Sequence, residues 1–326
     1  MNKMGTKTLV EAALLTGIAA IIMIASAYVP FFILVGIIVW PVPITLLTFR
    51  HDIKTSIVAL IALLVIVSGI ITPVSALSMG LVYGVPAIVL GFCLRKKYSP
   101  FITIMAMALS MFLANILLFK AAALLTGVDL LRDSMKLYYE SMDKSKEILK
   151  GLGVSEAQLG KSAQMTLSPE LLNTILPGLL AVTALIGSYI NYYFVGVIFR
   201  KLRIKVNEIS MIKPIDEWYL NNNVAYGLFF ITIISMGLMY LKVSYSEIVF
   251  PSVYFIFTFA FTINGLAVLA WFLKTRGISR KVRILIMVLV IFMNMGQILF
   301  FAGLIDFAID FRKVNPLRGK RIRPGE

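Results

Sequence analysis

The sequence has few charged residues, few metal-binding residues and none of the common enzyme motifs. Only 14% of its 326 residues are charged, whereas soluble domains carry about a quarter. The single cysteine, Cys93, cannot form an intramolecular disulfide, and with only one histidine, His51, a Cys/His metal site is excluded. The sequence contains no Walker loop, HExxH, GxSxG or CxxC. It therefore predicts a protein that is not an enzyme and has no metal or cofactor.

Hydrophobic residues are correspondingly abundant. They make up 60% of the chain, and the mean hydropathy is +0.92. One core cannot hide so many apolar side chains, so lipid must solvate part of the surface. The net charge of +15 does not point to nucleic acid, because the basic residues fall in short clusters between apolar runs and are not interleaved with aromatics. The predicted partner is membrane lipid.

Nine apolar runs are long enough, or nearly so, to cross a bilayer as helices. They are residues 9–29, 31–49, 55–71, 74–94, 101–125, 169–199, 224–241, 248–273 and 282–309. The first is interpreted as a retained span and not as a cleaved signal peptide, because another apolar run follows it directly. The sequence thus predicts an all-α, polytopic membrane protein of about nine spans. If 282–309 is re-entrant, the number is eight.

The basic residues alternate between successive turns in a way that orients the chain. The turns near Pro30 and Pro73 are short and uncharged, whereas the opposite turns carry basic clusters at 50–54 and 95–97. With the N-terminus inside, the inner segments hold 17 of the 31 Lys and Arg residues, and the short outer loops hold only Lys242. We therefore predict a plasma-membrane protein with a cytoplasmic N-terminus. The basic tail, 312–326, would lie outside with nine spans and inside with eight.

The loop 128–168 between the fifth and sixth spans is the one soluble feature. It contains apolar residues at spacings of three and four, typical of an amphipathic helix. These residues, with one serine among them, are Leu131, Met135, Tyr138, Met142, Ser145, Leu149 and Leu152. The loop is predicted outside the membrane, either as a helix on the membrane surface or as a lid over an outward-facing site.

Polar residues within the spans are candidates for a binding site, because each costs free energy in lipid unless it faces protein or water. The deep amides are Asn115, Asn191, Asn264, Asn294 and Gln297. Each of them singly could form an interhelical hydrogen bond. Together, over four spans, they favour a shared polar, water-accessible cavity.

Two other patterns within the spans allow alternatives. Lys120 and Asp306 are both expected near the outer interface, where they could form an ion pair or act separately as interfacial groups. Ala12, Thr16 and Ala20 repeat every four residues, which places small side chains on one face of the first span. Such a face lets another helix approach closely, either from this chain or from a partner.

Three segments carry a resemblance to a known family. They are EAALLTGIAA from Glu11, WPVPITLL from Trp40 and GLIDFAIDFRK from Gly303. With them, the whole chain resembles the YybS family of Firmicute membrane proteins, and its first six spans are similar to the substrate-binding S component of energy-coupling-factor (ECF) transporters. That resemblance implies a docking role for Ala12, Thr16 and Ala20, with a transmembrane coupling subunit and ATPases in separate chains.

The resemblance also divides the chain and suggests a function. Residues 1–199 would form the S-component-like bundle, 200–223 a basic cytoplasmic loop, 224–311 three further spans and 312–326 the basic tail. The implied function is uptake of a small vitamin- or metabolite-type molecule. The alternative is a non-transporting scaffold or regulator that recruits partners through its loops.

Overall fold

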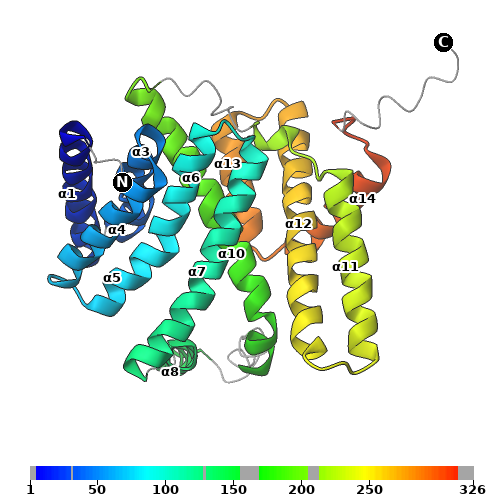
Figure 1. Ribbon diagram of the computed structural model, residues 1–326. Coiled ribbons are helices and arrows are strands. Elements are labelled where there is room, and N and C mark those ends of the chain that lie inside the picture. Colours follow the sequence, from blue (N-terminus) through cyan, green and yellow to red (C-terminus); the bar gives the residue numbers. More distant parts are fainter. Residues whose placement is uncertain (1–4, 31, 128–129, 155–168, 205–212, 315–326) are drawn as a thin grey trace, which may run out of the picture. The chain divides into compact units, whose positions relative to one another are not determined.

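The computed structural model consists of helices and their connections in the part of the chain that it describes: residues 5–30, 32–127, 130–154, 169–204 and 213–314 (Figure 1). The prediction of an all-α, polytopic membrane protein is confirmed. The helices are α1 (Thr6–Tyr28), α2 (Phe32–Val39), α3 (Pro41–Arg50), α4 (Ile53–Ser68), α5 (Pro73–Met79), the π-helical η1 (Gly80–Gly84), α6 (Val85–Arg95), α7 (Pro100–Thr126), α8 (Leu130–Gly151), α10 (Pro169–Lys201), the 3₁₀-helical η2 (Ile215–Glu217), α11 (Asn222–Tyr240), α12 (Ser246–Thr275), α13 (Arg280–Phe292) and α14 (Gly296–Ile309).

The chain forms two compact units. Unit 1 comprises residues 1–169 and 183–210, and unit 2 comprises residues 170–182 and 211–326. The first half of α10 therefore packs with unit 2, where Ser252 donates a hydrogen bond to the Thr174 carbonyl at 2.8 Å. The boundary between the two units thus crosses the chain within α10 and again after residue 210. The sequence suggested a boundary after residue 199. The predicted basic loop and tail lie largely outside the described residues.

Several helices begin at a capping side chain. Asp52 caps α4, and Thr72 and Ser99, each followed by proline, cap α5 and α7. Hydrogen bonds from the side chain and backbone N–H of Thr55 hold the pKa of Asp52 below its ordinary value. These caps allow the short turns that the sequence predicted between apolar runs.

Six helical segments are long and apolar enough to cross a membrane, among the residues that the structure describes. They are Thr6–Tyr28, Pro73–Arg95, Pro100–Leu124, Leu171–Lys201, Asn222–Tyr240 and Ser246–Thr275. Two shorter apolar helical segments, Val35–Arg50 and Ile53–Ser68, correspond to the second and third predicted spans. At 1.5 Å per residue each reaches about 24 Å, short of the ~30 Å hydrocarbon layer. The predicted count of nine is therefore not confirmed.

The last apolar run is not one straight helix. α13 and α14 are bent by 115° at a break that contains Asn294, whose φ of 55° is left-handed. α14 packs more extensively against α12 than any other pair of helices in the described chain. Gly265 and Gly303 allow this approach, because a Cβ on Gly303 would lie 2.0 Å from the Phe261 carbonyl oxygen.

Aromatic contacts show that α14 runs in the same direction as α12. The ring of Phe300 lies 6.0 Å from that of Phe257, and the ring of Phe311 lies 5.9 Å from that of Trp271. Residue numbers thus rise together along the two helices, so both end at the same end of unit 2. α13 leaves that end and α14 returns toward it (Figure 1). This geometry favours the re-entrant alternative over a ninth crossing.

The core of unit 1 is built around Trp40. This side chain is fully buried and packs among Met23, Ile44 and Leu63. α3 and α6 run in parallel, because Thr45 lies beside Ala87 and Thr48 lies beside Gly91. Their basic C-terminal ends are therefore neighbours within the unit.

The N-terminal part of α1 joins that basic end. Glu11 accepts a hydrogen bond from Arg50, and its second carboxylate oxygen lies 2.8 Å from His51 Nε2. The ring of Phe199, just before Arg200, lies 5.8 Å from that of Phe49. Unit 1 thus gathers the basic clusters of three turns at one end, as the charge alternation requires. That this end faces the cytoplasm stays a prediction.

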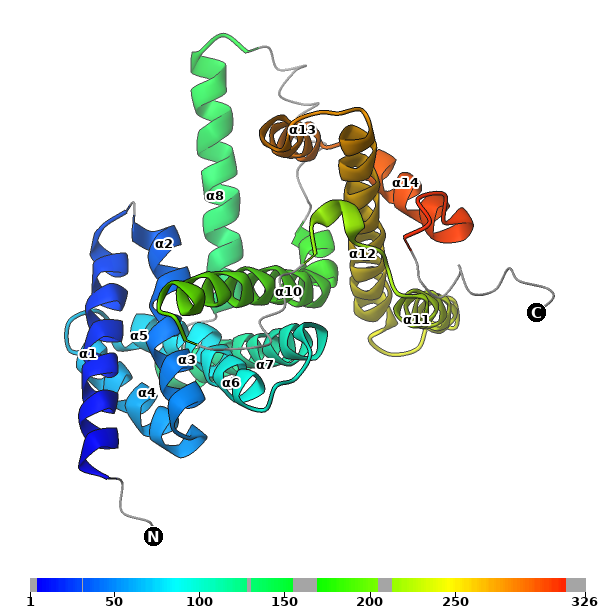
Figure 2. The ribbon, with the colours of Figure 1, turned by 90° about the horizontal axis from the view of Figure 1, so that it is seen from above.

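α8 confirms the predicted amphipathic helix. It is seen end-on in Figure 1 and along its length in Figure 2, whereas α7 runs along the plane of Figure 1, so α8 lies crosswise to α7. Within unit 1 it makes only modest contact with α7. This direction suits a helix on a membrane surface, although its predicted side stays a prediction.

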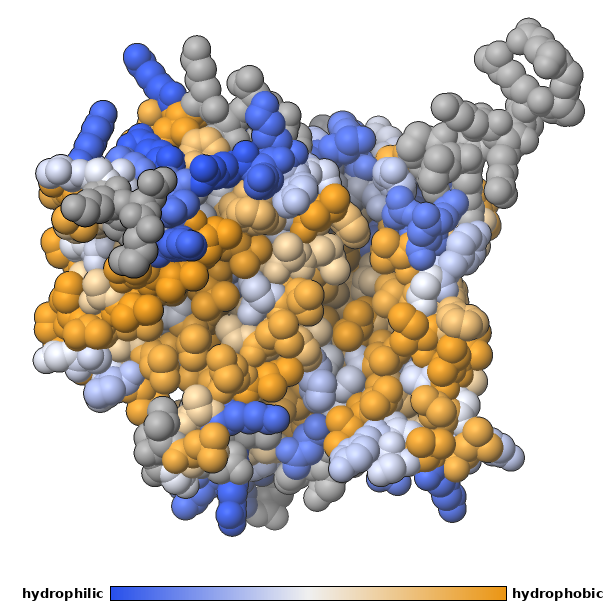
Figure 3. Space-filling view, in the orientation of Figure 1, coloured by the Kyte–Doolittle hydropathy of each residue, from blue (hydrophilic) through white to orange (hydrophobic). Residues whose placement is uncertain are grey.

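Hydrophobic side chains cover the flanks of the helices in both units. Figure 3 shows orange surface along the helices and hydrophilic residues near the helix ends. Leu14 and Ile21 of α1 are 64% and 70% exposed, and Phe230 of α11 is 66% exposed. Such large apolar exposure along whole helices requires lipid as the solvent.

Candidate functional site

A small cavity with polar groups in its wall lies inside unit 1, among α3, η1, α6, α7 and the second half of α10. It has about 10 Å³ open to the centre of a water molecule, which is room for one water. It is lined by Pro41, Thr45, Val82, Tyr83, Pro86, Ala87, Leu90, Met107, Met111, Ser188, Asn191 and Val195. Among these described lining residues, none carries a charge.

Two of the polar groups in the wall have no hydrogen-bond partner. Ser188 is 1% exposed and Asn191 is 9% exposed, and the Ser188 hydroxyl and the Asn191 carbonyl oxygen are both unpaired. The Asn191 amide nitrogen donates to the Gly187 carbonyl at 3.1 Å, which leaves only the acceptor end free. Each unpaired group costs about 1–3 kcal/mol when buried. A ligand or a water that pairs with them would recover part of that cost.

The cavity lies well inside the helices that line it, at a distance from their basic ends. Asn191 is ten residues from Lys201 at the end of α10, or about 15 Å along the helix. Tyr83 is twelve residues from Arg95 at the end of α6, or about 18 Å. Both values are close to half of a ~30 Å bilayer core.

The wall formed by η1 has a distinct backbone. Five residues, Gly80–Gly84, are π-helical and lie directly before Pro86, which has no N–H to donate to the preceding turn. Gly84 also meets Leu60 and Trp40 so closely that a Cβ would lie 2.6 Å from Leu60 Cδ1. π-Helical turns often occur at functional sites. The GLVYGVP sequence from Gly80 was the available signal, and the sequence-based prediction did not use it.

The five amides predicted to share a cavity do not all line this one. Asn191 alone of the five lines the cavity, and Asn115 instead donates to the Met111 carbonyl of its own helix at 2.8 Å. Asn294 and Gln297 are exposed near the break between α13 and α14, and Asn264 belongs to unit 2. Asn191 also donates to a carbonyl of its own helix, so depth and local bonding alone did not show which amide lines the cavity.

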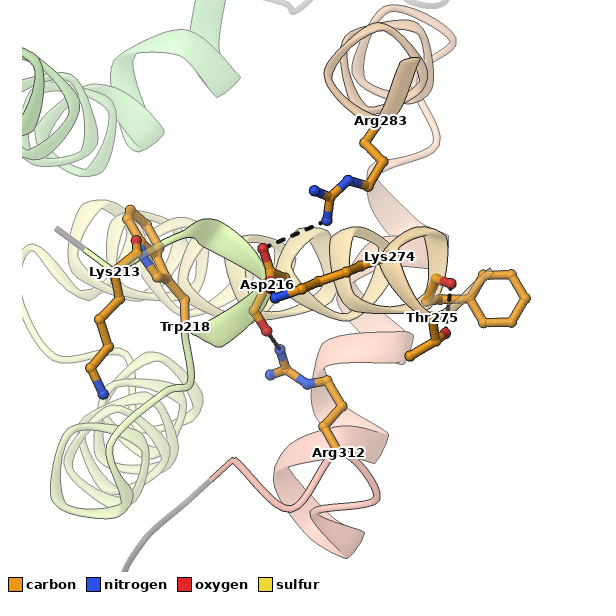
Figure 4. Close-up of polar contacts among 8 residues, drawn as sticks. Lys213, Asp216, Trp218, Lys274, Thr275, Arg283 and Arg312 are labelled. Carbon is orange, nitrogen blue, oxygen red and sulfur yellow. Dashed lines mark hydrogen bonds and ion pairs between the residues drawn. The ribbon is translucent and has the colours of Figure 1, made fainter. Parts of the chain in front are cut away.

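A cluster of charged residues forms in unit 2 around Asp216 (Figure 4). Asp216 lies in η2 and is 6% exposed. Lys274, at the end of α12, forms an ion pair with one of its carboxylate oxygens, and Arg283 Nη1 lies 3.8 Å from the other. Arg312 Nη1 lies 3.5 Å from the Asp216 carbonyl oxygen. The short helix η2 is thereby tied to three other segments of unit 2.

Arg312 is also the centre of a second, deeper contact. Its side chain is fully buried, and Nη2 donates to Asp306 at 2.7 Å and to the Asn264 side-chain oxygen at 3.1 Å. Asn264 in turn donates to the Gly303 carbonyl at 2.8 Å. Burying charged side chains costs free energy, so Arg312 can pack inside unit 2 only because it pairs with Asp306.

Asp306 binds Arg312 within unit 2, and the Lys120–Asp306 ion pair, one of the two alternatives for these residues, stays a prediction. Lys120 is exposed and belongs to unit 1. Sequence reasoning missed Arg312 and Asp216 because both fall outside the apolar runs and were counted as loop charges. The spacing of Asp306 and Arg312, six residues, was the only local signal.

The small-residue face of α1 packs within the chain. Ala12, Thr16 and Ala20 are 8%, 6% and 5% exposed. Ala12 packs against Leu47 of α3 and Ala59 of α4. These residues therefore face other helices of this chain, which is one of the two alternatives for the pattern. Docking of a separate coupling subunit stays a prediction, and this face is already covered within unit 1.

No group of three or more His, Cys, Asp or Glu side chains that could hold a metal occurs in the described ranges. Glu11 has His51 and Arg50 as neighbours, but Arg50 is a cation that opposes metal binding. Cys93 is buried.

Comparisons with known proteins agree with this picture of a membrane protein. The model of the family "Predicted membrane protein (DUF2232)" matches residues 17–307. The uncharacterised protein YybS of Bacillus subtilis (strain 168) is 25% identical over 216 residues, which cover 65% of this chain and 67% of YybS. No solved structure matches, and similarity to ECF S components is not shown. Because the family model covers most of the sequence, the chain belongs to the DUF2232 family of predicted membrane proteins.

Proposed function

We propose that this protein binds a small, uncharged molecule in the unit 1 cavity and serves as the substrate-binding component of an uptake system. The observation that carries the proposal is the pair of unpaired polar groups, Ser188 and Asn191, that face a mid-membrane cavity beside a π-helical turn. Transport proteins commonly bind their substrates near the bilayer midplane, where irregular helices line a cavity.

The wall suggests the chemistry of the ligand. The Asn191 carbonyl accepts a hydrogen bond, and the Ser188 hydroxyl both donates and accepts. Leu90, Met107 and Met111 add apolar surface, and Met side chains adapt readily to different shapes. A neutral molecule with an amide-like or hydroxyl edge and an apolar body fits these groups. An ion would be disfavoured by the uncharged wall.

The cavity has room for about one water. Binding of a vitamin- or nucleoside-sized ligand would require η1 or α10 to move. Because the sequence carries no nucleotide-binding motif, energy for transport would come from ATPases and a coupling subunit in other chains. That subunit would dock on a surface other than the covered face of α1.

A matched pair of variants tests the proposal. Asn191→Leu removes the unpaired carbonyl, whereas the control Asn115→Leu removes an amide of unit 1 that also donates to its own helix. The purified proteins are screened by thermal unfolding against a panel of neutral vitamins, nucleosides and amides. A ligand at about 100 times its Kd stabilises by about 2.7 kcal/mol, which shifts the midpoint by a few degrees.

We expect at least one compound to stabilise the wild type and Asn115→Leu but not Asn191→Leu. Without ligand, Asn191→Leu should be at least as stable as the wild type, because an unpaired acceptor has been removed. The proposal fails if every compound leaves the wild type unchanged, or if a stabilising compound acts equally on Asn191→Leu. Native mass spectrometry of the protein as purified provides a second search for a bound small molecule.

One feature favours a different function. α8 is long, makes modest contact with its own unit and displays charges of both signs, among them Lys136, Glu140 and Asp143. Such a helix would suit a non-transporting membrane protein that recruits partners through this loop. Cross-linked pull-downs with the wild type separate the two functions: recovery of an ATPase module supports transport, and recovery of other partners, lost when the α8 charges are reversed, supports recruitment.

A further inference from the structure

The turn between α12 and α13 carries a concentration of positive charge. This turn contains five basic residues, which we call the lipid clamp: Lys274, Arg276, Arg280, Lys281 and Arg283. No acidic residue occurs between positions 274 and 283. In unit 2 the nearest described carboxylate is Asp216, which already contacts Lys274 and Arg283. The clamp is therefore left with an excess of positive charge that this part of the chain does not neutralise.

Arg283 is the least satisfied member of the clamp. Its Nη1 is 3.8 Å from Asp216, beyond hydrogen-bond distance, while Lys274 holds the other oxygen of the same carboxylate. Its Nε is buried and has no partner, although the side chain as a whole is 17% exposed. A guanidinium whose terminal nitrogen is only loosely held can donate hydrogen bonds to the oxygens of a phosphate group.

The helix that follows the clamp is apolar and uncovered. None of the residues of α13 is buried, and Ile284, Leu285 and Val288 are 49%, 57% and 42% exposed. The chain thus passes within a few residues from five cations to a surface suited to acyl chains. The Arg side chains lie in the first turn of α13, where the helix dipole also favours an anion.

We propose that the lipid clamp binds the phosphate headgroup of an anionic phospholipid, whose acyl chains lie along α13. Charge complementarity favours an anion, and the adjoining apolar helix favours a lipid over a soluble phosphate. Arg283 contributes the specific contact, and Lys274, Arg280 and Lys281 contribute general attraction. The proposal is independent of the ligand in unit 1, because it concerns only residues of unit 2.

Lipid binding to the full-length protein tests this proposal. The delipidated protein in neutral detergent is titrated with phosphatidylglycerol or with phosphatidylcholine of the same acyl chains, and bound lipid is counted by native mass spectrometry. Each basic residue near a membrane contributes about a five-fold increase in attraction to anionic lipid. The triple variant Arg280→Gln, Lys281→Gln, Arg283→Gln should therefore weaken phosphatidylglycerol binding on the order of 100-fold.

Two further variants make the result specific. The triple variant Lys144→Gln, Lys146→Gln, Lys150→Gln on α8 removes the same charge and should change binding by less than about three-fold, since the clamp stays intact. Arg283→Lys keeps the positive charge but loses the forked arrangement of N–H donors. It should therefore weaken the binding of phosphatidylglycerol and leave the binding of phosphatidylcholine unchanged. Unchanged circular dichroism in each variant shows that the fold is retained.

Three results would overturn the proposal. They are equal affinity for the two lipids, unchanged phosphatidylglycerol binding in the clamp variant, and an equal loss in the α8 variant. Inorganic phosphate or glycerol phosphate serves as the probe for a soluble anion. If either competes with phosphatidylglycerol at equal concentration, the clamp is a soluble-anion site and the lipid assignment is wrong.

Discussion

Replacing Arg312 by Met should destabilise unit 2 substantially. The substitution leaves Asp306, which is 4% exposed, without its cation, and it removes the donor to the Asn264 oxygen. Removing one partner of a buried pair typically costs about 3–5 kcal/mol. Loss of the hydrogen bond to Asn264 adds about 1 kcal/mol. We therefore expect a net loss of about 4 kcal/mol or more.

The size of the interaction itself comes from a double-mutant cycle. Asp306→Leu together with Arg312→Met replaces both ions by apolar groups, and such replacements are often neutral or stabilising. The double variant should therefore be more stable than Arg312→Met alone, with a coupling energy of at least ~2 kcal/mol. The free energy of unfolding is measured by SDS titration in mixed micelles. Trp271, whose ring lies 5.9 Å from that of Phe311, serves as a local fluorescence reporter once the other tryptophans are replaced.

Two outcomes would refute this reasoning. A loss below about 1 kcal/mol for Arg312→Met would show that water solvates Asp306 once Arg312 is removed. A double variant as unstable as the sum of the two single variants would show that the residues do not interact. The control is Lys313→Met, which removes the neighbouring cation, an exposed one, and should change stability by no more than about 0.5 kcal/mol.

Gly303→Ala should lower the free energy of unfolding by several kcal/mol, as in overpacked cores, because the added Cβ would meet the backbone of α12. Gly227 has open space around it, so Gly227→Ala should raise the free energy of unfolding by up to about 1 kcal/mol in the same SDS titration. Asp52→Ala should cost about 0.5–2 kcal/mol at neutral pH. Because the folded-state pKa of Asp52 is lowered, its contribution is present above the ordinary value of 3.8 and is lost as pH falls through the folded pKa, so the wild type and the variant should converge in acid. Cysteines at Arg276 and Lys313 in a cysteine-free background should label from the same side of the membrane if α13 and α14 form a re-entrant pair; labelling from opposite sides would restore a ninth span.

The fold class was predictable because lipid imposes a simple rule on sequence. A helix that crosses a membrane must be apolar over most of its length, so the apolar runs locate the helices directly. The capping residues Asp52, Thr72 and Ser99 and the prolines after two of them fixed the turns. The break at Asn294 was not predictable from composition, because the apolar run continues through it without a charge or proline.

The site was harder to predict because sequence gives depth but not direction. Asn115 and Asn191 lie at similar distances from the ends of their helices and both donate to a carbonyl four residues earlier. Only the packing of α3, η1 and α10 turns Asn191 into a cavity wall. The position of Arg312 likewise depends on a local reversal: Asp310 and Lys313 both have left-handed backbone angles, and the chain folds back so that Arg312 reaches Asp306.

The buried polar groups of this protein differ in their hydrogen-bond partners, and this difference indicates which of them would bind a ligand. Asn115 uses its own helix, and Asp306 and Arg312 pair with each other, although Asp306 Oδ1 and Arg312 Nε are buried without a partner. The Trp40 Nε1 atom is also buried without a partner, but Trp40 does not line the cavity. Ser188 and Asn191 differ because they are one helical turn apart, both unpaired, and line the same cavity. Leaving two neighbouring polar groups unpaired in one uncharged cavity lowers the stability of the fold. A bound molecule that pairs with both groups is the simplest reason for their presence.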